Sequence, residues 1–140
     1  MSPRKAASTV NQTLHLSRVV VADNNPVVRA AIRQVLDNAG NIIVVAEAAD
    51  GQKACTLAGQ QKPDVLVVDM NLTAMNGIEV TRWVRSHYPA MGVLVLTASE
   101  DEPQIQAVLR AGANGTVPKT ANAEAIVEAV RSAAKRKEHS

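Results

Sequence analysis

The stretch that decides the fold is Val65-Leu66-Val67-Val68-Asp69. Four consecutive apolar residues are typical of a strand that is buried on both faces of a parallel sheet. Pro63 closes the loop before this strand, and Asp69 places a carboxylate directly at its carboxyl end. In parallel α/β sheets, functional residues gather at the carboxyl ends of the strands. The stretch therefore predicts both a fold class and the position of a site.

Apolar runs and helical periods alternate on both sides of this strand. Asn25-Pro26 is typical of a helix start, and Ser99 with Glu102 predicts a capping box for a later helix. The strand-helix unit is repeated about five times, which predicts an α/β fold with a parallel sheet wrapped by helices. The other expected strands are residues 19–22, 42–46, 93–96 and 115–118, and the expected helices begin near residues 26, 50, 78, 102 and 122.

The composition limits the kind of protein. The chain has 140 residues, 46% of them hydrophobic, which is enough for one core but crowded for two. No apolar stretch approaches the roughly 20 residues of a membrane-spanning helix, and residues 1–17 lack the apolar block of a secretory signal. Cys55 is the only cysteine, so no internal disulfide is possible. We therefore expect a cytoplasmic protein with no membrane partner.

The basic residues are concentrated at the two ends of the chain. Residues 1–18 contain three basic residues and no acidic one, residues 131–140 contain four basic and one acidic, and the stretch between them contains eight basic and twelve acidic residues. We therefore expect a flexible basic tail over residues 1–17, a folded domain over 18–134 and a basic tail over 135–140. Because aromatic residues are not interleaved with the basic ones, nucleic acid is not favoured as the main ligand.

Polar side chains follow four of the expected strands. Asp23 and Asn24 follow the first strand, Asp69 ends the third, Thr97 ends the fourth and Lys119 follows the fifth. Each residue alone has an ordinary interpretation, such as a turn, a cap or a solvated lysine. Together they predict one cluster, in which oxygen ligands suit Mg²⁺, a carboxylate can attack a phosphoryl group, and an ammonium neutralises the charge that develops.

The segments that carry these residues are Val19–Asn24, Val67–Asn71 with Gly77 eight residues after Asp69, Leu96–Ala98, and Ala111–Gly115 leading to Pro118-Lys119. They resemble the receiver domains of response regulators in two-component signalling, from about Arg18 to Ala134, and look most like receivers that precede a C-terminal helix-turn-helix. The resemblance implies a flavodoxin-like, doubly wound, five-stranded parallel sheet in the order 2-1-3-4-5, flanked by five helices. Residues 18–134 would then be the receiver domain.

The resemblance also assigns roles to the residues at the first and third strand ends. It implies that Asp69 is the phosphoacceptor and that a histidine kinase or a phosphotransfer protein donates the phosphoryl group. Asp23, Asn24 and Asp69 would hold Mg²⁺, and Asn71 would offer its main-chain carbonyl to the ion. The implied function is a phospho-aspartate signalling switch, which is not an enzyme beyond its own phosphotransfer and dephosphorylation.

The remaining strand ends would carry the response. By resemblance, Thr97 is the switch hydroxyl and Lys119 pairs with the phosphoryl group. The helix near residues 102–111, the strand 115–118 and the helix from about residue 122 would form the face that controls a partner or an output domain. A homodimer through this face is expected as an option. DNA would be a partner only if an output domain exists beyond this chain.

The sequence departs from the family pattern at three positions. Asn24 replaces the usual second acid of the metal pocket, so Mg²⁺ binding should be weakened by about ten- to a hundredfold. Thr116 occupies the aromatic switch position three residues before Lys119, so no ring can turn inward there. Thr73 stands where the family often has proline, which predicts a more mobile loop after Asp69.

These departures leave alternatives to a phosphorylated switch. The chain could be a degenerate receiver that binds partners without phosphorylation. An aspartyl-nucleophile phosphatase is less favoured, since it usually needs a general acid two residues after its nucleophile, and Asn71 cannot serve as one. A flavin-binding protein is also disfavoured, because the first strand is followed by Asn24-Asn25-Pro26-Val27 and not by a phosphate-binding loop.

Overall fold

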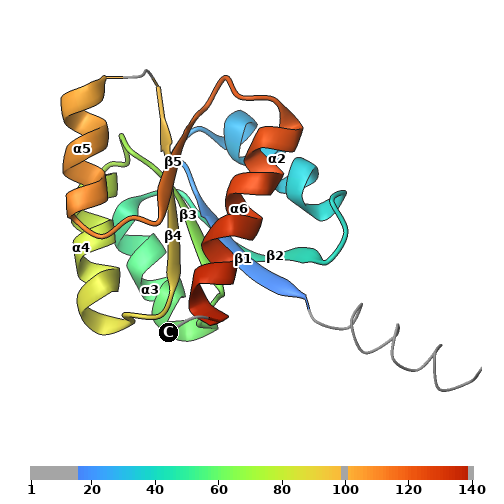
Figure 1. The fold of residues 1–140 in the computed structure, drawn as a ribbon, viewed down its shortest axis with the longest axis horizontal. Helices are drawn as coiled ribbons and strands as arrows, with labels where there is room; N and C mark the ends of the chain where they lie inside the picture. Colours follow the sequence, from blue (N-terminus) through green and yellow to red (C-terminus); the bar gives the residue numbers. More distant parts are fainter. Residues whose placement is uncertain (1–15, 99–100, 139–140) are drawn as a thin grey trace, which may run out of the picture.

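The computed structural model describes residues 16–98 and 101–138, which fold as a five-stranded sheet with helices on both faces (Figure 1). The strands are hydrogen-bonded in the order β2-β1-β3-β4-β5, and every pair is parallel. The α/β prediction and the strand order 2-1-3-4-5 are thereby confirmed. The elements in chain order are β1 (Ser17–Ala22), α2 (Pro26–Asp37), β2 (Ile42–Ala48), α3 (Gly51–Gln61), β3 (Val65–Asp69), α4 (Gly77–His87), β4 (Gly92–Thr97), α5 (Glu102–Arg110), β5 (Gly115–Pro118) and α6 (Ala123–Glu138).

Two apolar cores lie on opposite faces of the sheet. Alternate residues of each strand point to opposite faces, so Val20 and Leu66 pack under α3, α4 and α5, whereas Val19 and Val65 pack under α2 and α6. Figure 1 shows α3, α4 and α5 together on one side of the sheet and α2 with α6 on the other. All five residues of β3 are buried, as the continuous apolar run predicted.

The helix starts follow local capping chemistry in most cases. The Asn25 side chain accepts hydrogen bonds from the main-chain N–H groups of Val27 and Val28, and the Asp50 side chain accepts one from Lys53. The capping box predicted from Ser99 and Glu102 is wrong. Helix α5 begins at Glu102 after the N-cap Asp101, whose side chain makes no cap hydrogen bond, and Ser99 lies outside the described residues.

The register of the strands brings their carboxyl ends to one edge of the sheet. Ala22 of β1 lies opposite Val68 of β3, and Asp69 lies opposite Leu96 of β4. Thr97 then lies opposite Pro118 of β5. The residues that follow β1 and β5 therefore share one edge with the last residues of β3 and β4.

Helix α6 is longer than the sequence pattern indicated. It continues to Glu138, so residues 135–138, expected in the basic tail, are helical. Lysine, arginine and glutamate favour helix, although these four residues supply no apolar side chain that would mark it in the sequence. None of the helices in the described ranges is long and apolar enough to cross a membrane.

Candidate functional site

Asp69 is a buried carboxylate at the end of the central strand β3. Only 3% of the residue is exposed. Its Oδ1 accepts a hydrogen bond of 3.2 Å from the main-chain N–H of Asn71, and its Oδ2 accepts one of 2.9 Å from Nζ of Lys119. The next residue, Met70, donates its N–H to the Leu96 carbonyl and extends the ladder by one step. Asp69 is thus held in place by the sheet while its carboxylate faces the edge.

Asp23, directly after β1, is fully buried. Its Oδ1 accepts a hydrogen bond of 2.8 Å from the main-chain N–H of Asn25, and its own N–H donates to the Ala48 carbonyl. Its Oδ2 lies 2.9 Å from Nζ of Lys119, yet it has no hydrogen-bond partner, so this contact is an ion pair without hydrogen-bond geometry. Asp23 therefore presents a buried carboxylate oxygen that is paired with Lys119 by charge and accepts no hydrogen bond.

Lys119 joins the two carboxylates. Its Nζ lies 2.9 Å from the Oδ2 atoms of both Asp23 and Asp69. Burial disfavours its charged form, but the hydrogen bond to Asp69 and the contact with Asp23 outweigh burial and raise the pKa of Lys119. Its main-chain N–H donates to the Thr97 carbonyl at 2.8 Å. One ammonium therefore bridges the ends of β1 and β3 and is anchored to the end of β4.

The structure brings some predicted residues into direct contact and leaves others at the rim. Thr97 ends β4 with only 1% of the residue exposed, and it reaches the site through its main-chain contact with Lys119. Thr116 is half-buried in β5, opposite Val95. Asn24 and Asn71 are exposed and directly follow Asp23 and Met70 in the chain. The site thus has a buried charged centre and an exposed amide rim.

The donor set fits a hard cation such as Mg²⁺. Mg²⁺ is usually held by one or two carboxylates and keeps several waters. Asp23 Oδ2, which accepts no hydrogen bond, is an oxygen of the kind that such an ion would bind, and Asp69 adds a second carboxylate. Within residues 16–98 and 101–138, no three His, Cys, Asp or Glu side chains gather as a metal site. Further protein ligands would have to be amide or main-chain oxygens.

The loop after Asp69 packs closely against two glycines, Gly51 and Gly77. A Cβ on Gly77 would lie 2.8 Å from Cα of Met70, and a Cβ on Gly51 would lie 1.9 Å from the Met75 carbonyl oxygen. The Thr73 carbonyl accepts hydrogen bonds from the N–H groups of Gly51 and Met75, at 3.0 and 2.7 Å. The loop that carries Asn71 is therefore tied to α3 even though Thr73 replaces proline.

Gly51 was not predicted from the sequence. The only local signal is its place after the N-cap Asp50, which does not show that a loop more than twenty residues later would approach it. The spacing between Asp69 and Gly77 is part of the family resemblance, and the structure gives that spacing a physical reason. Only a residue without a side chain lets the start of α4 lie against the main chain of Asp69 and Met70.

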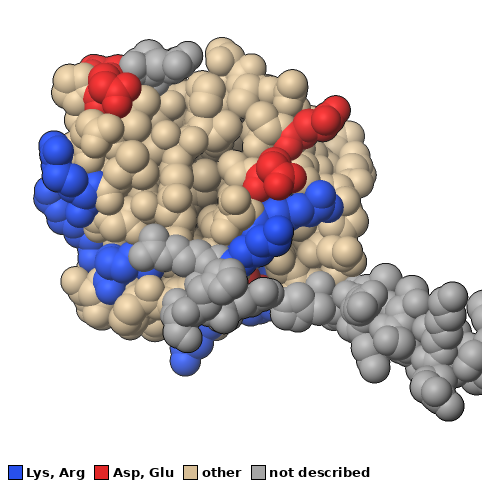
Figure 2. Space-filling model, in the orientation of Figure 1, with Lys and Arg blue, Asp and Glu red and all other residues tan. Residues whose placement is uncertain are grey.

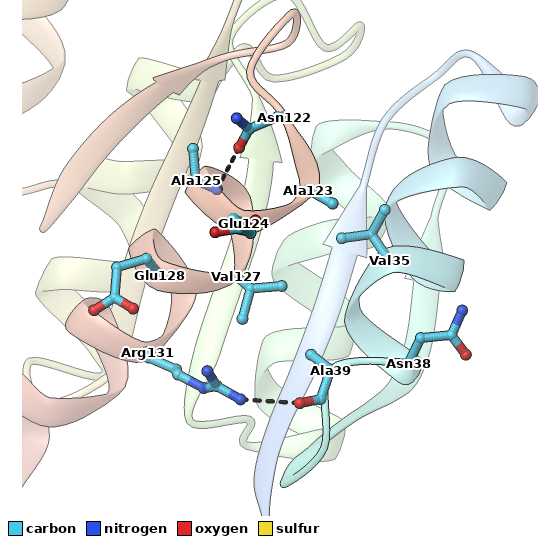
Figure 3. Close-up of a pocket in the computed structure, with 10 residues that line it drawn as sticks. All are labelled: Val35, Asn38, Ala39, Asn122, Ala123, Glu124, Ala125, Val127, Glu128 and Arg131. Atoms are coloured by element: carbon cyan, nitrogen blue, oxygen red, sulfur yellow. Dashed lines mark hydrogen bonds between the residues drawn. The ribbon is translucent and has the colours of Figure 1, made fainter.

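A surface groove lies away from these carboxylates. Figure 3 shows a groove between α2 and α6, with Val35 and Val127 facing each other across it. Arg131 closes one end by donating to the Ala39 carbonyl at 3.0 Å. Over α6, acidic and basic side chains lie side by side on the surface (Figure 2). A smaller apolar cavity of 300 Å³, lined by Val27 and Val28 among others, reaches Lys119 and so adjoins the charged centre.

The comparisons with known proteins identify a family. The family described as the response regulator receiver domain matches residues 19–131. The chain belongs to this family. A transcriptional regulatory protein, DegU of Brevibacillus brevis, is 35% identical over 81% of this receiver chain and 48% of its own length. The nitrate/nitrite response regulator protein NarP of Escherichia coli is 33% identical over 84% of the chain and 55% of its own length.

Solved receiver structures show the same fold. The signal receiver domain of the putative response regulator NarL from Mycobacterium tuberculosis superposes with a TM-score of 0.84 at 34% identity, covering 86% of this chain and 98% of that one. A two-component response regulator of the LuxR family from Aurantimonas gives a TM-score of 0.82 at 31% identity, covering 86% of each chain. The receiver chain spans about half the length of the curated relatives it matches.

Proposed function

We propose that this receiver domain is a phospho-aspartate switch in which Asp69 accepts a phosphoryl group from a histidine kinase or a phosphotransfer protein. The observation that carries the proposal is the buried pair of carboxylates, Asp23 and Asp69, bridged by the single ammonium of Lys119. A structural role alone would favour a fully hydrogen-bonded pair, whereas Asp23 keeps an oxygen without a hydrogen bond.

The side chains divide the work of phosphotransfer. An Asp69 carboxylate oxygen forms a bond to phosphorus while the phosphorus–nitrogen bond of the donor phosphohistidine breaks, and the imidazole nitrogen leaves with the electron pair. The N–H of Asn71 holds the other Asp69 oxygen in position. Lys119, whose raised pKa keeps it charged, neutralises the phosphoryl oxygens as they gain charge.

Asp23, Asp69, the Asn24 amide oxygen and the Asn71 main-chain carbonyl are the residues we assign to Mg²⁺ binding. When bound there, the ion would supply positive charge to the oxygens of the transferring group. Asn24 contributes an oxygen but no charge, so we expect the ion to bind more weakly than in a pocket with three carboxylates.

The response would pass through the residues attached to the ammonium. Lys119 is bonded through its main chain to Thr97, and it directly follows β5. A phosphoryl group on Asp69 would attract the Thr97 hydroxyl and the Lys119 ammonium. This attraction would shift the conformation of the face formed by α5, β5 and α6. We propose that this face controls a partner or an output domain, and that it can pair with a second copy. Thr116 leaves this movement to the main chain.

The setting follows from the same family membership. We propose a cytoplasmic signalling protein whose donor approaches the carboxyl edge of the sheet, where the apolar cavity beside Lys119 offers a contact surface. DegU is named a transcriptional regulatory protein. DNA would be a partner here only through an output domain beyond this chain. Asn24 and Thr116 favour a second candidate function, a receiver that binds its partner without phosphorylation.

Acetyl phosphate with Mg²⁺, followed by intact-mass measurement, tests the proposal. The wild-type chain should gain the mass of one phosphoryl group, and Asp69→Asn should gain none because an amide is not a nucleophile of this kind. Asp101→Asn, which removes an exposed carboxylate at the start of α5, is the matched control and should be labelled like wild type. Undiminished labelling of Asp69→Asn would refute the assignment. An unlabelled wild-type chain would favour the second candidate.

A further inference from the structure

Arg29 reaches from helix α2 to the main chain of the site. Its Nη1 donates a hydrogen bond of 2.6 Å to the carbonyl oxygen of Asp23. Its Nε donates to Oε1 of Glu47 at 3.0 Å, and its side chain is only 20% exposed. Arg29 stands in the first turn of α2, where its own N–H donates to the Asn25 carbonyl. The guanidinium therefore lies between the helix start, strand β2 and the end of β1.

Glu47 fixes the guanidinium of Arg29 from the opposite side. It lies on β2 opposite Val21 of β1, and its second oxygen accepts a hydrogen bond from Arg33. The hydrogen bond to Arg33 lowers the pKa of Glu47, the contact with Arg29 lowers it further, and both outweigh its partial burial. Glu47 thus stays ionised near neutral pH and holds Arg29 with a charge-assisted hydrogen bond.

We propose that Arg29 is a positioning residue for the metal-binding end of β1, acting through the main chain of Asp23. Asp23 is held at its N–H by the Ala48 carbonyl, at its carboxylate by the Asn25 N–H, and at its carbonyl by Arg29. The first two contacts are local to the strand ends. Arg29 adds the third and so holds Asp23 with its Oδ2, which accepts no hydrogen bond, towards Lys119 and the ion.

The chemistry of the contact calls for arginine. The planar guanidinium offers donors in several directions at once, so one side chain can bond the Asp23 carbonyl and the Glu47 carboxylate together. A lysine in this place has one nitrogen on a flexible chain and would hold both oxygens less rigidly. Residues that orient metal ligands from behind commonly change metal affinity by about ten- to a hundredfold when they are replaced.

This inference rests on the proposed function for its metal, so the experiment includes a measurement without metal. The variants are Arg29→Gln, Arg29→Lys and, as the matched control, Arg33→Gln, which also loses a bond to Glu47 but does not touch Asp23. Each folded variant is measured in two ways. Hydrogen exchange of the Asp23 and Asn25 amides is followed without metal, and Mg²⁺ binding is followed by calorimetric titration.

Arg29→Gln should speed exchange of the Asp23 and Asn25 amides and weaken Mg²⁺ binding, each by about tenfold. Arg29→Lys should recover part of both effects, and Arg33→Gln should stay within about twofold of wild type. Unchanged exchange in Arg29→Gln would overturn the proposal, as would an equal effect in Arg33→Gln. If the wild-type chain does not bind Mg²⁺, the proposed metal site fails, and the exchange comparison alone decides the role of Arg29.

Discussion

The two ends of the parallel sheet differ in whether their polar groups are all hydrogen-bonded. At the amino end, Oδ2 of Asp64 accepts a hydrogen bond of 2.8 Å from the Arg18 main-chain N–H. The main-chain N–H of Asp64 donates to the Arg18 carbonyl at 2.8 Å, and its main-chain carbonyl accepts the Gly92 N–H at 2.9 Å. The Arg18 guanidinium donates to the Gln61 carbonyl at 2.6 Å. At the carboxyl end, Asp23 and Asp69 share one ammonium, and Asp23 keeps an oxygen with no hydrogen bond.

The difference separates a structural end from a functional one. A buried polar group without a hydrogen bond costs about 1–3 kcal/mol. At the amino end this cost is avoided, because the polar groups link the starts of β1, β3 and β4 to one another. At the carboxyl end the ion pair with Lys119 offsets part of this cost for Asp23 Oδ2, and the same oxygen is one that a metal cation would use. Stability and chemistry thus occupy opposite edges of one sheet.

The largest effect on this comparison should come from Asn24→Asp. A restored carboxylate beside Asp23 should tighten Mg²⁺ binding by about ten- to a hundredfold, because it adds a charge to the metal pocket. Without metal, the same charge crowds Asp23 and Asp69, so the unfolding temperature should fall, and Mg²⁺ should restore it. Calorimetric titration and thermal unfolding with and without Mg²⁺ measure the two effects.

The control for this change is Asn38→Asp, which adds a carboxylate at the exposed C-terminal end of α2, at the other end of that helix from Asn24. It should leave the Mg²⁺ titration unchanged. A titration curve for Asn24→Asp that matches wild type would show that Asn24 does not lie beside the ion, and the carboxyl edge would then have only two acidic ligands.

Asp64→Asn tests the amino end. The amide oxygen can still accept the Arg18 N–H, but the hydrogen bond is weaker because the acceptor loses its charge. The free energy of unfolding in urea should fall by about 1–3 kcal/mol, while labelling by acetyl phosphate stays within about twofold of wild type. A loss of labelling in folded Asp64→Asn protein would contradict the separation of the two ends.

Sequence patterns predicted the carboxyl end well because its placement depends on strands. Each apolar run ends at a polar residue, and the parallel register then brings Asp23, Asp69 and Lys119 together. The contacts of Arg29 and Gly51 could not be predicted in this way. Each joins residues far apart in the sequence, and no local pattern marks an arginine that bonds a carbonyl or a glycine that meets a loop.

The error at α5 also has a physical reason. A helix capped by Ser99 would place Pro103 at the fourth helical position, where its missing N–H would remove the first hydrogen bond of the helix. The helix begins instead at Glu102, so Pro103 stands in the first turn, where no N–H is needed. The proline thus determines the helix start more strongly than the pair Ser99 and Glu102.

The smallest effect concerns alkaline pH and compares the two cations of the sheet ends. Lys119 has a pKa raised in the folded state by Asp69 and Asp23, so its ion pairs stabilise the fold fully below its ordinary pKa of 10.5, and this contribution is lost as the pH rises through the folded value. Arginine stays charged throughout this range, so the Arg18 contacts persist.

Above pH 10.5 the wild-type free energy of unfolding should therefore fall more steeply with pH than that of Lys119→Gln. The total extra loss should be about 1 kcal/mol or less, because part of the Lys119 side chain is exposed to solvent. Urea unfolding of both proteins at a series of pH values measures the difference, and subtracting one slope from the other removes the contributions of the remaining lysines and Tyr88. The reason is electrostatic. A neutral lysine leaves Asp23 and Asp69 without the cation between them, whereas glutamine at position 119 has no proton to lose. Equal slopes would mean that the bridge adds no net stability, and the carboxyl edge would then be held by the main-chain bonds of Asp23, Asp69 and Thr97 alone.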